Sequence, residues 1–372
     1  MNILMLNWKD IKHPQVGGAE IIVYEIAKRM VKDGHKVTLF CRRFIYSKQE
    51  EIIDGIHVVR RGNLITMYLH ATAYYWTLRN KPDLVIDMSN TIYWQTPLWA
   101  FKSKKIAYLN QLALDVFKYE YNWVLALFGG IAEKLQYLTY KNTPFICYSE
   151  STKQDLEAMG VPEKNISVFS LGIDHKRYKP GEKAKYPLFL CVSRLVKMKR
   201  TDLVIKAMKY VVAKHKNAKL AIVGYGYDRK RLELLRNYLE LENNVFFQDE
   251  NILFFGQNVK DEKVKTMQTA WALVFPSVKE GWGMTVTECA ACGTPTIATN
   301  VTGLKDSVVN GKTGVLVSEN PTPEEIANEM MKLIENEKLR NDMSKNAILW
   351  SKQFDWDRSY SEFIGIIKKV TK

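Results

Sequence analysis

Short apolar runs alternate with stretches of helical periodicity along the first part of the chain. An apolar run at 2–7 is followed by a polar loop, and apolar residues then recur at helical spacing from Ile21 to Met30. Gly34 ends this predicted helix, and residues 36–40 predict a second strand. A strand, helix, strand order implies parallel strands in a doubly wound α/β sheet. Further strands are predicted at 57–60, 84–87, 105–109, 145–148 and 168–171.

A polar segment at 178–187, which holds two prolines and Gly181, interrupts this alternation. Its composition predicts a linker between two domains, and a second β/α series follows it. Strands are predicted in this series at 187–192, 219–223, near 252–255, and at 271–275, 296–299 and 315–317. Helices are predicted at 201–214, 229–241, 261–270 and 323–335, with a last amphipathic helix from 355 to the end.

Length and charge add to this pattern. A chain of 372 residues is long for a single core and suggests two domains. Its formal net charge of +14 favours an anionic partner, which could be nucleic acid, an acidic membrane surface or a phosphorylated substrate. Nowhere do 18 apolar residues run together, so no membrane-spanning helix is expected. The first residues predict a strand rather than a signal peptide.

The five cysteines lack the spacing of a disulfide framework, which favours a reducing compartment and a cytoplasmic location. Cys289 and Cys292 form a C-x-x-C without a second pair or a nearby His. We therefore expect them to be small packing residues rather than metal ligands.

The stretch from Glu280 to Glu288 predicts a strand, a Gly-punctuated loop and a helix that Gly293 ends. Backbone N–H groups at the start of this helix have no intrahelical partner, so they form a ready anion site. The residues that supply them are Gly283, Met284 and Thr285. A nucleotide-sugar pocket needs hydrogen-bond donors that bind phosphate. It also needs flanking carboxylates that accept hydrogen bonds from sugar hydroxyl groups. Gly17-Gly18 precedes another predicted helix and predicts either a ligand-facing loop or a plain tight turn.

Taken together, these motifs resemble those of the GT-B glycosyltransferases of family 4, in the same order and over nearly the full length. Glu280 and Glu288 resemble the family's E-x7-E motif, and Arg194 and Lys199 match its Arg and Lys after the first strand of the second domain. Other matching segments are the glycine loop 17–20, the connecting segment 149–174, the V-G-x-G turn at Gly224 and the loop 303–317.

The resemblance implies two Rossmann-like, doubly wound parallel-sheet domains facing a cleft. Residues 1–174 would form the acceptor-side domain and residues 175–354 the donor domain. The last helix, 355–372, would pack back on the first domain. By the same resemblance, Gly17, Gly18 and Gly224 would contribute to donor binding together with the start of the helix at Gly283, Met284 and Thr285.

The resemblance also implies residue roles. Arg194 and Lys199 would hold the donor diphosphate by bidentate and point-charge contacts. Glu288 would accept hydrogen bonds from ribose, and Glu280 would contact the donor sugar. The family retains anomeric configuration, with front-face attack as the commonly proposed route. Catalysis would then be mostly positioning and electrostatics, without a metal or other cofactor.

One position departs from the family pattern. Many relatives carry a His after the strand that matches 105–109, whereas this chain has Asn110. Asn can hydrogen-bond a sugar hydroxyl but cannot act as an acid or base, which puts a His-dependent step in doubt.

Between 117 and 140 the chain is aromatic and apolar, with lysines nearby. It predicts either docking on an anionic membrane surface or a core helix with a partly exposed end, and the family's members with lipid-linked acceptors use this region similarly.

We therefore expect a retaining glycosyltransferase that moves a sugar from a nucleotide sugar, UDP- or GDP-linked, to a carbohydrate or lipid-linked acceptor. Its setting would be glycan, cell-surface polysaccharide or glycolipid synthesis, in the cytoplasm or peripherally on the cytoplasmic membrane face, with no nucleic acid partner. The alternatives are a nucleotide-sugar epimerase of the same fold and a non-catalytic basic binding protein, which would show salt-sensitive binding to nucleic acid.

Overall fold

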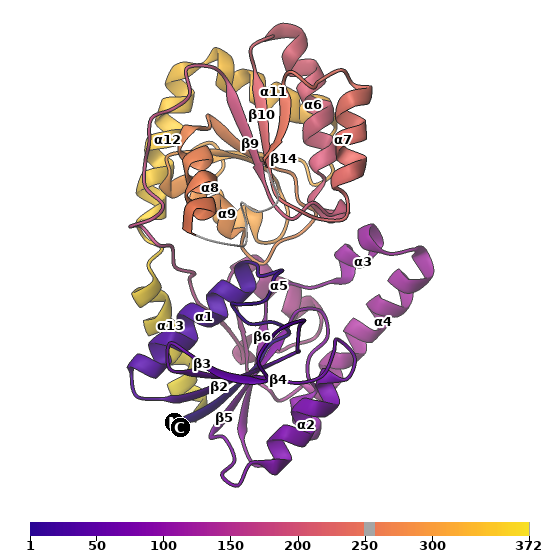
Figure 1. The fold of residues 1–372 in the computed structure, drawn as a ribbon, viewed down its shortest axis with the longest axis vertical. Coiled ribbons are helices and arrows are strands. Elements are labelled where there is room, and N and C mark those ends of the chain that lie inside the picture. The colour runs from indigo at the N-terminus through magenta and orange to yellow at the C-terminus, as the bar shows by residue number, and fades with distance from the viewer. Residues whose placement is uncertain (249–256, 372) are drawn as a thin grey trace. The chain divides into compact units, whose positions relative to one another are not determined.

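The computed structural model describes residues 1–248 and 257–371. The chain forms two compact units (Figure 1). Unit 1 comprises Met1–Phe117, Trp123–Gly172 and Trp356–Lys372, and unit 2 comprises Lys118–Asn122 and Ile173–Asp355. Each unit is a sheet with helices on both faces, as the alternation of strands and helices along the chain predicts.

Unit 1 contains an eight-stranded sheet in the order β3-β4-β2-β1-β5-β6-β7-β8. Every pairing in it is parallel except β3 with β4, so the edge strand departs from the predicted all-parallel sheet. The strands are β1 (Asn2–Leu6), β2 (Lys36–Cys41), β3 (Glu50–Ile53), β4 (Ile56–Arg60), β5 (Leu84–Ser89), β6 (Lys104–Leu109), β7 (Phe145–Cys147) and β8 (Ile166–Val168).

Two sets of helices cover the sheet of unit 1. Leu4 and Leu6 of β1 face Met67 and Ala71 of α2, and α1 and α13 lie together on the opposite face (Figure 1). Tyr360 of α13 donates a hydrogen bond to Asp33, beyond the end of α1, at 2.8 Å. The helices are α1 (Gly18–Lys32), α2 (Met67–Thr77), α3 (Leu114–Glu120, which runs into unit 2), α4 (Trp123–Thr139), α5 (Glu150–Ala158) and α13 (Trp356–Thr371).

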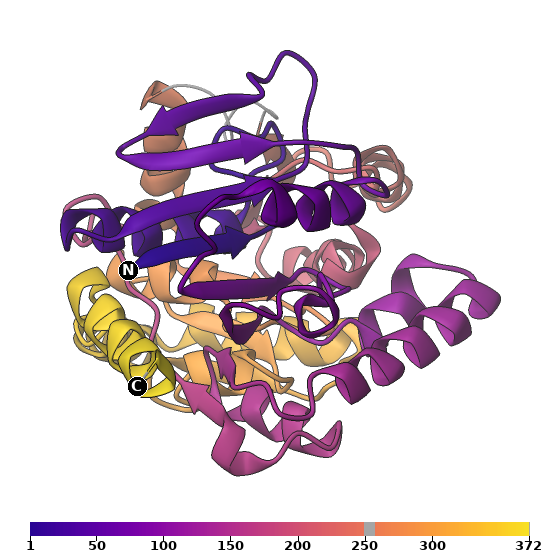
Figure 2. The same cartoon turned by 90° about the horizontal axis from the view of Figure 1, so that it is seen from below.

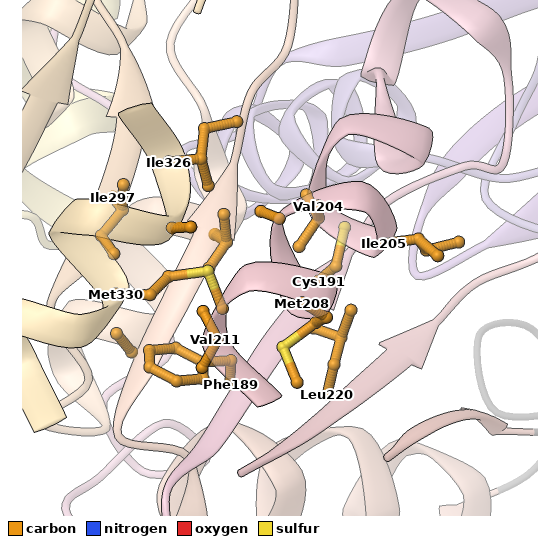
Figure 3. Packing of buried hydrophobic residues seen from close by; sticks show 14 of the residues in the cluster. Phe189, Cys191, Val204, Ile205, Met208, Val211, Leu220, Ile297, Ile326 and Met330 are labelled. Carbon is orange, nitrogen blue, oxygen red and sulfur yellow. The ribbon is translucent and has the colours of Figure 1, made fainter. Parts of the chain in front are cut away.

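Unit 2 contains a six-stranded, wholly parallel sheet in the order β11-β10-β9-β12-β13-β14. Its core includes Phe189, Met208, Leu220, Ile297 and Met330, which lie close together in Figure 3. The strands are β9 (Leu188–Val192), β10 (Lys219–Val223), β11 (Val245–Gln248), β12 (Ala272–Phe275), β13 (Thr296–Thr299) and β14 (Gly314–Val317). The helices are α6 (Thr201–Lys214), α7 (Arg229–Tyr238), α8 (Gln257–Thr269), α9 (Met284–Ala291), α10 (Leu304–Ser307), α11 (Pro323–Glu335) and α12 (Glu337–Ser351).

Some predicted elements need correction. The strand predicted at 168–171 begins earlier in the structure, because β8 comprises Ile166–Val168 and Phe169 packs on Phe363 of α13. The pattern also missed β3, β11 and α2. The strand predicted near 252–255 lies outside the described residues. Within the described ranges, no helix is long and apolar enough to cross a membrane.

Candidate functional site

The predicted donor-site residues of unit 2 lie near the point where the strand order of its sheet reverses. From β9 the chain proceeds outward through β10 and β11, and then returns to place β12 on the other side of β9. The loops that follow β9 and β12 therefore leave adjacent carboxyl ends in opposite directions. In open α/β sheets, such a switch point is where ligands bind.

Arg200 ties these two loops together. It is 7% exposed, and its guanidinium donates hydrogen bonds to Pro276 O at 2.6 Å and Ser277 O at 3.2 Å. Its φ of 50° lies in the left-handed region, so the backbone turns sharply between Lys199 and α6. The buried arginine thus sets where Lys199 stands relative to the loop after β12.

Lys199 and Glu280 form an ion pair across the switch point. Their side chains are only 11% and 13% exposed, and the Lys199 ammonium lies 5.5 Å from the centre of the Phe275 ring. Arg194, on the same loop as Lys199, is exposed, and its guanidinium makes no hydrogen bond or ion pair with any described residue, although its backbone carbonyl accepts from Ser193 Oγ at 3.1 Å. The site therefore holds one neutralised cation and one cation available to a ligand.

The start of α9 lies next to this pair in the chain. Gly283 occupies the N-cap position with a φ of 96°, and a Cβ there would lie 2.8 Å from the Leu304 side chain. Its carbonyl accepts the first helical hydrogen bond from Val286 N at 2.8 Å. The amides of Met284 and Thr285 precede that bond and have no intrahelical acceptor, as predicted for an anion site.

Glu288 is buried in a second ion pair, which the sequence reasoning missed. Lys263 of α8 places its ammonium 2.7 Å from the Glu288 carboxylate, and Tyr178 packs against the same lysine. Burial opposes the charge on Lys263, but attraction to Glu288 outweighs it and raises the pKa of the lysine. Glu288 is 6% exposed, so Lys263 compensates a carboxylate that would otherwise be buried without a counter-charge.

Gly224 has a packing role in the structure. A Cβ at this position would lie 1.9 Å from Ser193 O, which no side chain could tolerate. The absence of a side chain lets the turn after β10 approach the loop that carries Arg194 and Lys199.

Unit 1 has its own switch point, between β1 and β5, and amide side chains line it. Asn7 and Asn90 directly follow these strands, and Asn90 Nδ2 donates to Asn7 Oδ1 at 2.8 Å. Asn110, which directly follows β6, donates to Ser89 O at 2.8 Å and to Asn90 Oδ1 at 3.4 Å. The hydroxyl of Tyr148, after β7, donates to Asn110 Oδ1. Four residues from four strand ends thus form one uncharged hydrogen-bonded chain.

Gly17 and Gly18 also lie in unit 1, so the predicted donor-binding set is divided between the two units. Gly17 is the N-cap of α1, and its N–H donates to the Glu20 carboxylate at 2.7 Å. Glu20 is 4% exposed, and the Lys9 ammonium lies 4.0 Å from it. One backbone amide at the start of α1 is therefore already hydrogen-bonded to a carboxylate of the same chain.

Cys289 and Cys292 are buried free thiols near the end of α9, in agreement with the predicted packing role. Among the described residues, no group of three His, Cys, Asp or Glu side chains is placed to hold a metal ion.

Two family models cover most of the chain. Residues 172–350 match the model of the glycosyl transferases group 1, and residues 16–177 match that of glycosyltransferase family 4. The uncharacterized glycosyltransferase MJ1178 of Methanocaldococcus jannaschii is 30% identical over 361 residues, which are 96% of each chain.

Solved structures support the same assignment at the level of the fold. Sucrose-phosphate synthase from Thermosynechococcus elongatus has a TM-score of 0.82 at 19% identity, covering 99% of this chain and 98% of that one. HepE of Anabaena in complex with UDP-glucose has a TM-score of 0.75 at 19% identity, covering 99% of this chain and all of that one (100%). The sequence matches, the two α/β units and the site at the switch point lead to one conclusion: the chain belongs to the glycosyltransferases of family 4, with the GT-B fold.

Proposed function

We propose that this enzyme transfers a sugar from a nucleotide-diphosphate sugar, UDP- or GDP-linked, with retention of anomeric configuration. The observation that supports the donor most strongly is the pair of lysine–glutamate contacts at the ends of one short segment, Lys199 with Glu280 and Lys263 with Glu288. The start of α9 lies between the two glutamates. The complex of HepE with UDP-glucose supports a donor of this class.

In this proposal the diphosphate binds at the amides of Met284 and Thr285, where the helix dipole favours negative charge. The Arg194 guanidinium, exposed and without a hydrogen-bond partner among the described residues, closes on it with a bidentate contact. Lys199 has three N–H donors, so it can keep Glu280 while it gives another hydrogen bond to phosphate.

Each glutamate then serves one sugar. Glu288, held on one oxygen by Lys263, offers its other oxygen to the ribose hydroxyls. Glu280, held by Lys199, accepts from hydroxyls of the transferred sugar. Gly224 brings the turn after β10 against the loop that carries Arg194 and Lys199.

Catalysis in this scheme comes from charge stabilisation on the leaving diphosphate. Arg194, Lys199 and the helix start neutralise that charge as the glycosidic bond breaks, so we expect no metal requirement. Asn110 cannot accept a proton at neutral pH, and the leaving phosphate would take the proton of the acceptor hydroxyl in a front-face reaction.

For the acceptor we propose a carbohydrate or lipid-linked glycan that binds unit 1, with Asn110 as one hydroxyl contact. Its amide is largely committed within the protein, and Oδ1 retains one lone pair for an acceptor hydroxyl. We place the enzyme in the cytoplasm, peripherally on an anionic membrane surface where such an acceptor would be found.

The test compares donor hydrolysis and transfer by the wild type with the variants Glu280→Ala and Arg194→Ala. We expect a loss of about 100-fold or more in kcat/KM for each. Glu163→Ala is the matched control, because Glu163 forms a lysine ion pair on the surface of unit 1, away from the site.

Unchanged activity in both site variants would overturn the proposal. A nucleotide sugar altered in configuration without consumption of any acceptor would instead identify an epimerase.

A further inference from the structure

Arg42, which directly follows β2 in unit 1, is a cation that lacks hydrogen-bond acceptors. Its Nε atom is buried and has no partner among the described residues. Its Nη2 atom lies 3.1 Å from His13 Nε2, and no other hydrogen bond or ion pair of this guanidinium occurs in the described part of the chain. Burial lowers the pKa of Arg42, but arginine stays protonated at neutral pH. Because buried polar groups are normally paired, the unpaired N–H groups of Arg42 need an explanation.

His13 does not supply the missing acceptor. Its Nδ1 atom lies 3.0 Å from the backbone N–H of Gln15, and its Nε2 atom faces the Nη2–H group of Arg42. A neutral imidazole has one N–H group and one acceptor nitrogen. Whichever nitrogen carries the proton, one N–H group of the ring therefore faces another N–H group. Arg42 and His13 together have more N–H groups than acceptors, and we call this pair the Arg42–His13 cluster.

The nearby carboxylates are engaged with other partners. Glu20 attracts Arg42 electrostatically but forms no ion pair with it in the described structure, and its carboxylate accepts from Gly17 N at 2.7 Å. Asp10 accepts two hydrogen bonds from the guanidinium of Arg60, at 2.7 and 2.8 Å. Neither carboxylate therefore pairs with Arg42, and the missing acceptor comes from outside the chain, from solvent or from a ligand.

The loop that carries His13 is anchored, so a small movement does not relieve this mismatch. The side chains of Asp10 and Arg60 are both 0% exposed. A buried ion pair is costly to break, because one charge is then left uncompensated. The His13 ring also packs edge-on against Phe44, with 5.1 Å between the ring centres. The ring is therefore held in place before any ligand binds.

The Arg42–His13 cluster lies beside the neutral hydrogen-bonded chain of unit 1. Strands β1 and β2 are parallel neighbours (Figure 2), so the loop after β1 and the residue after β2 lie at the same edge of the sheet. Trp8 connects the two places, because it directly follows Asn7 and its carbonyl accepts from Arg42 N at 3.2 Å. The cluster is therefore next to the place where we expect the acceptor to bind.

The chemistry of the cluster fits a phosphoryl group. A guanidinium binds phosphate through two parallel N–H bonds, which are stronger than bonds between neutral groups. Phosphate also offers a further oxygen to the His13 ring, whereas a carboxylate has only two oxygens. Positive charge surrounds the ring as well, since burial lowers the pKa of His13 to about 4, followed in importance by Arg42 and Lys9. Arg42 is half-buried and has no ion pair to lose when it turns toward an anion.

We propose that the Arg42–His13 cluster binds a phosphoryl group of the sugar acceptor and makes the enzyme prefer phosphorylated acceptors to neutral ones. The anion supplies the acceptor oxygens that both side chains lack. Only its assignment to the sugar acceptor rests on the proposed function, because binding of the anion itself needs no transfer.

The test follows the Cε1–H resonance of His13 by NMR in the full chain at about pH 7, while inorganic phosphate is added at constant ionic strength. His13→Gln identifies this resonance among those of the six histidines. The resonance reports on the surroundings of the ring, which separates this site from phosphate bound elsewhere. We expect a saturable shift in the wild type and a Kd that is about tenfold or more higher in Arg42→Gln.

Arg43→Gln is the matched control, since it removes the same charge from the next residue, whose side chain is exposed. It should bind phosphate as the wild type does. Without phosphate, the thermal midpoint of Arg42→Gln should be no lower than that of the wild type. The substitution removes an unpaired buried N–H group and breaks no ion pair.

Two further anions and a transfer assay sharpen the test. Acetate should bind about tenfold more weakly than phosphate, because it has one oxygen fewer for the ring. Dimethyl phosphate that binds as well as phosphate would indicate a phosphodiester, as in a lipid-linked acceptor, whereas a preference for inorganic phosphate would indicate a terminal phosphate on a sugar. In transfer assays, Arg42→Gln should raise the KM for the acceptor about tenfold, with a smaller change in the KM for the nucleotide sugar.

Absence of a shift at His13, or the same Kd in Arg42→Gln and the wild type, would overturn the inference. Equal binding of acetate and phosphate would overturn the choice of a phosphoryl group. An unchanged acceptor KM in Arg42→Gln would overturn its assignment to the acceptor. Phosphate binding at His13 in a protein that hydrolyses no nucleotide sugar would instead count against the proposed function alone.

Discussion

The two units carry the same kind of switch point but fill it with different chemistry. In unit 2 the loops after β9 and β12 meet through the ion pair of Lys199 and Glu280. In unit 1 the ends of β1 and β5 meet through the amides of Asn7 and Asn90. The fold therefore sets where side chains converge, and the residues in the loops after the strands set whether that place is charged or neutral.

This contrast suits a division of labour in glycosyl transfer. A departing diphosphate develops negative charge and needs cations and helix amides, which unit 2 supplies. An acceptor hydroxyl needs hydrogen bonds that orient it, which the amide chain of unit 1 can supply without a charge.

The largest expected effect comes from removing the charge at unit 2. Lys199→Met should lower kcat/KM about 100- to 1000-fold, because the diphosphate loses a cation and Glu280 loses its partner. Asn110→Ala, which removes a neutral group from the hydrogen-bonded chain of unit 1, should cost less than about tenfold. Equal losses of kcat/KM in the two variants would contradict the contrast between a charged site in unit 2 and a neutral one in unit 1.

A second prediction concerns His13, a titratable group on the loop after β1 of unit 1. Burial, with Arg42 next in importance, lowers its pKa from 6.5 to about 4, so the ring stays neutral in the folded protein. Between these two values the unfolded chain binds a proton that the folded chain does not bind. Stability should therefore fall as the pH drops from 6.5 to about 4, by up to about 3 kcal/mol from this residue.

The measurement is the urea midpoint at about pH 7 and about pH 4.5 for the wild type and for His13→Gln. The variant should lose less stability than the wild type over this interval. An identical loss in both proteins would mean that His13 is not held neutral in unit 1.

Third, Lys263→Met should raise the donor KM about tenfold with a smaller change in kcat, because Glu288 loses the partner that positions it for ribose. Glu288→Gln should act similarly. If Lys263 and Glu288 act as a pair, the double variant should be little worse than either single variant. Fully additive losses would contradict the pairing. A thermal midpoint for each variant separates this effect from loss of folding.

The smallest expected change in kcat/KM comes with a new pH dependence. Asn110→His should change kcat/KM only a few-fold, but it places a titratable ring in the neutral chain of unit 1. The ratio of variant to wild-type activity should therefore vary with pH between about 5.5 and 8. A ratio that does not change across this range would show that position 110 lies away from the reacting groups.

Sequence reasoning predicted the parts of the site that are close together in the chain. The eight-residue separation of Glu280 and Glu288 spans one loop and the first turns of one helix, so local rules were sufficient. Lys263 was missed because it reaches Glu288 from another helix, 25 positions earlier. Nothing in the periodicity of α8 distinguishes this lysine from an exposed one.

The sequence contains a signal for the hydrogen-bonded side chains of unit 1, but the predictions from the sequence did not use it. Asn7, Asn90 and Tyr148 each stand directly after a strand, where side chains of a parallel sheet converge. Asn7 and Asn90 are 83 positions apart, and their contact becomes visible only with the strand order. For α4, the apolar pattern left open a surface-docking segment and a core helix with a partly exposed end, and only the hydrogen bonds of Glu133 and Gln136 show which side of the helix faces inward.

The most direct test of the account is a thermal-shift titration with UDP-, GDP- and ADP-sugars, using the wild type and Glu288→Gln. A nucleotide sugar present at about 100 times its Kd should stabilise the wild type by about 2.7 kcal/mol. The account predicts that at least one UDP- or GDP-sugar does so, and that Glu288→Gln needs about tenfold more ligand for the same shift. No shift with any nucleotide sugar, or the same shift in both proteins, would contradict it.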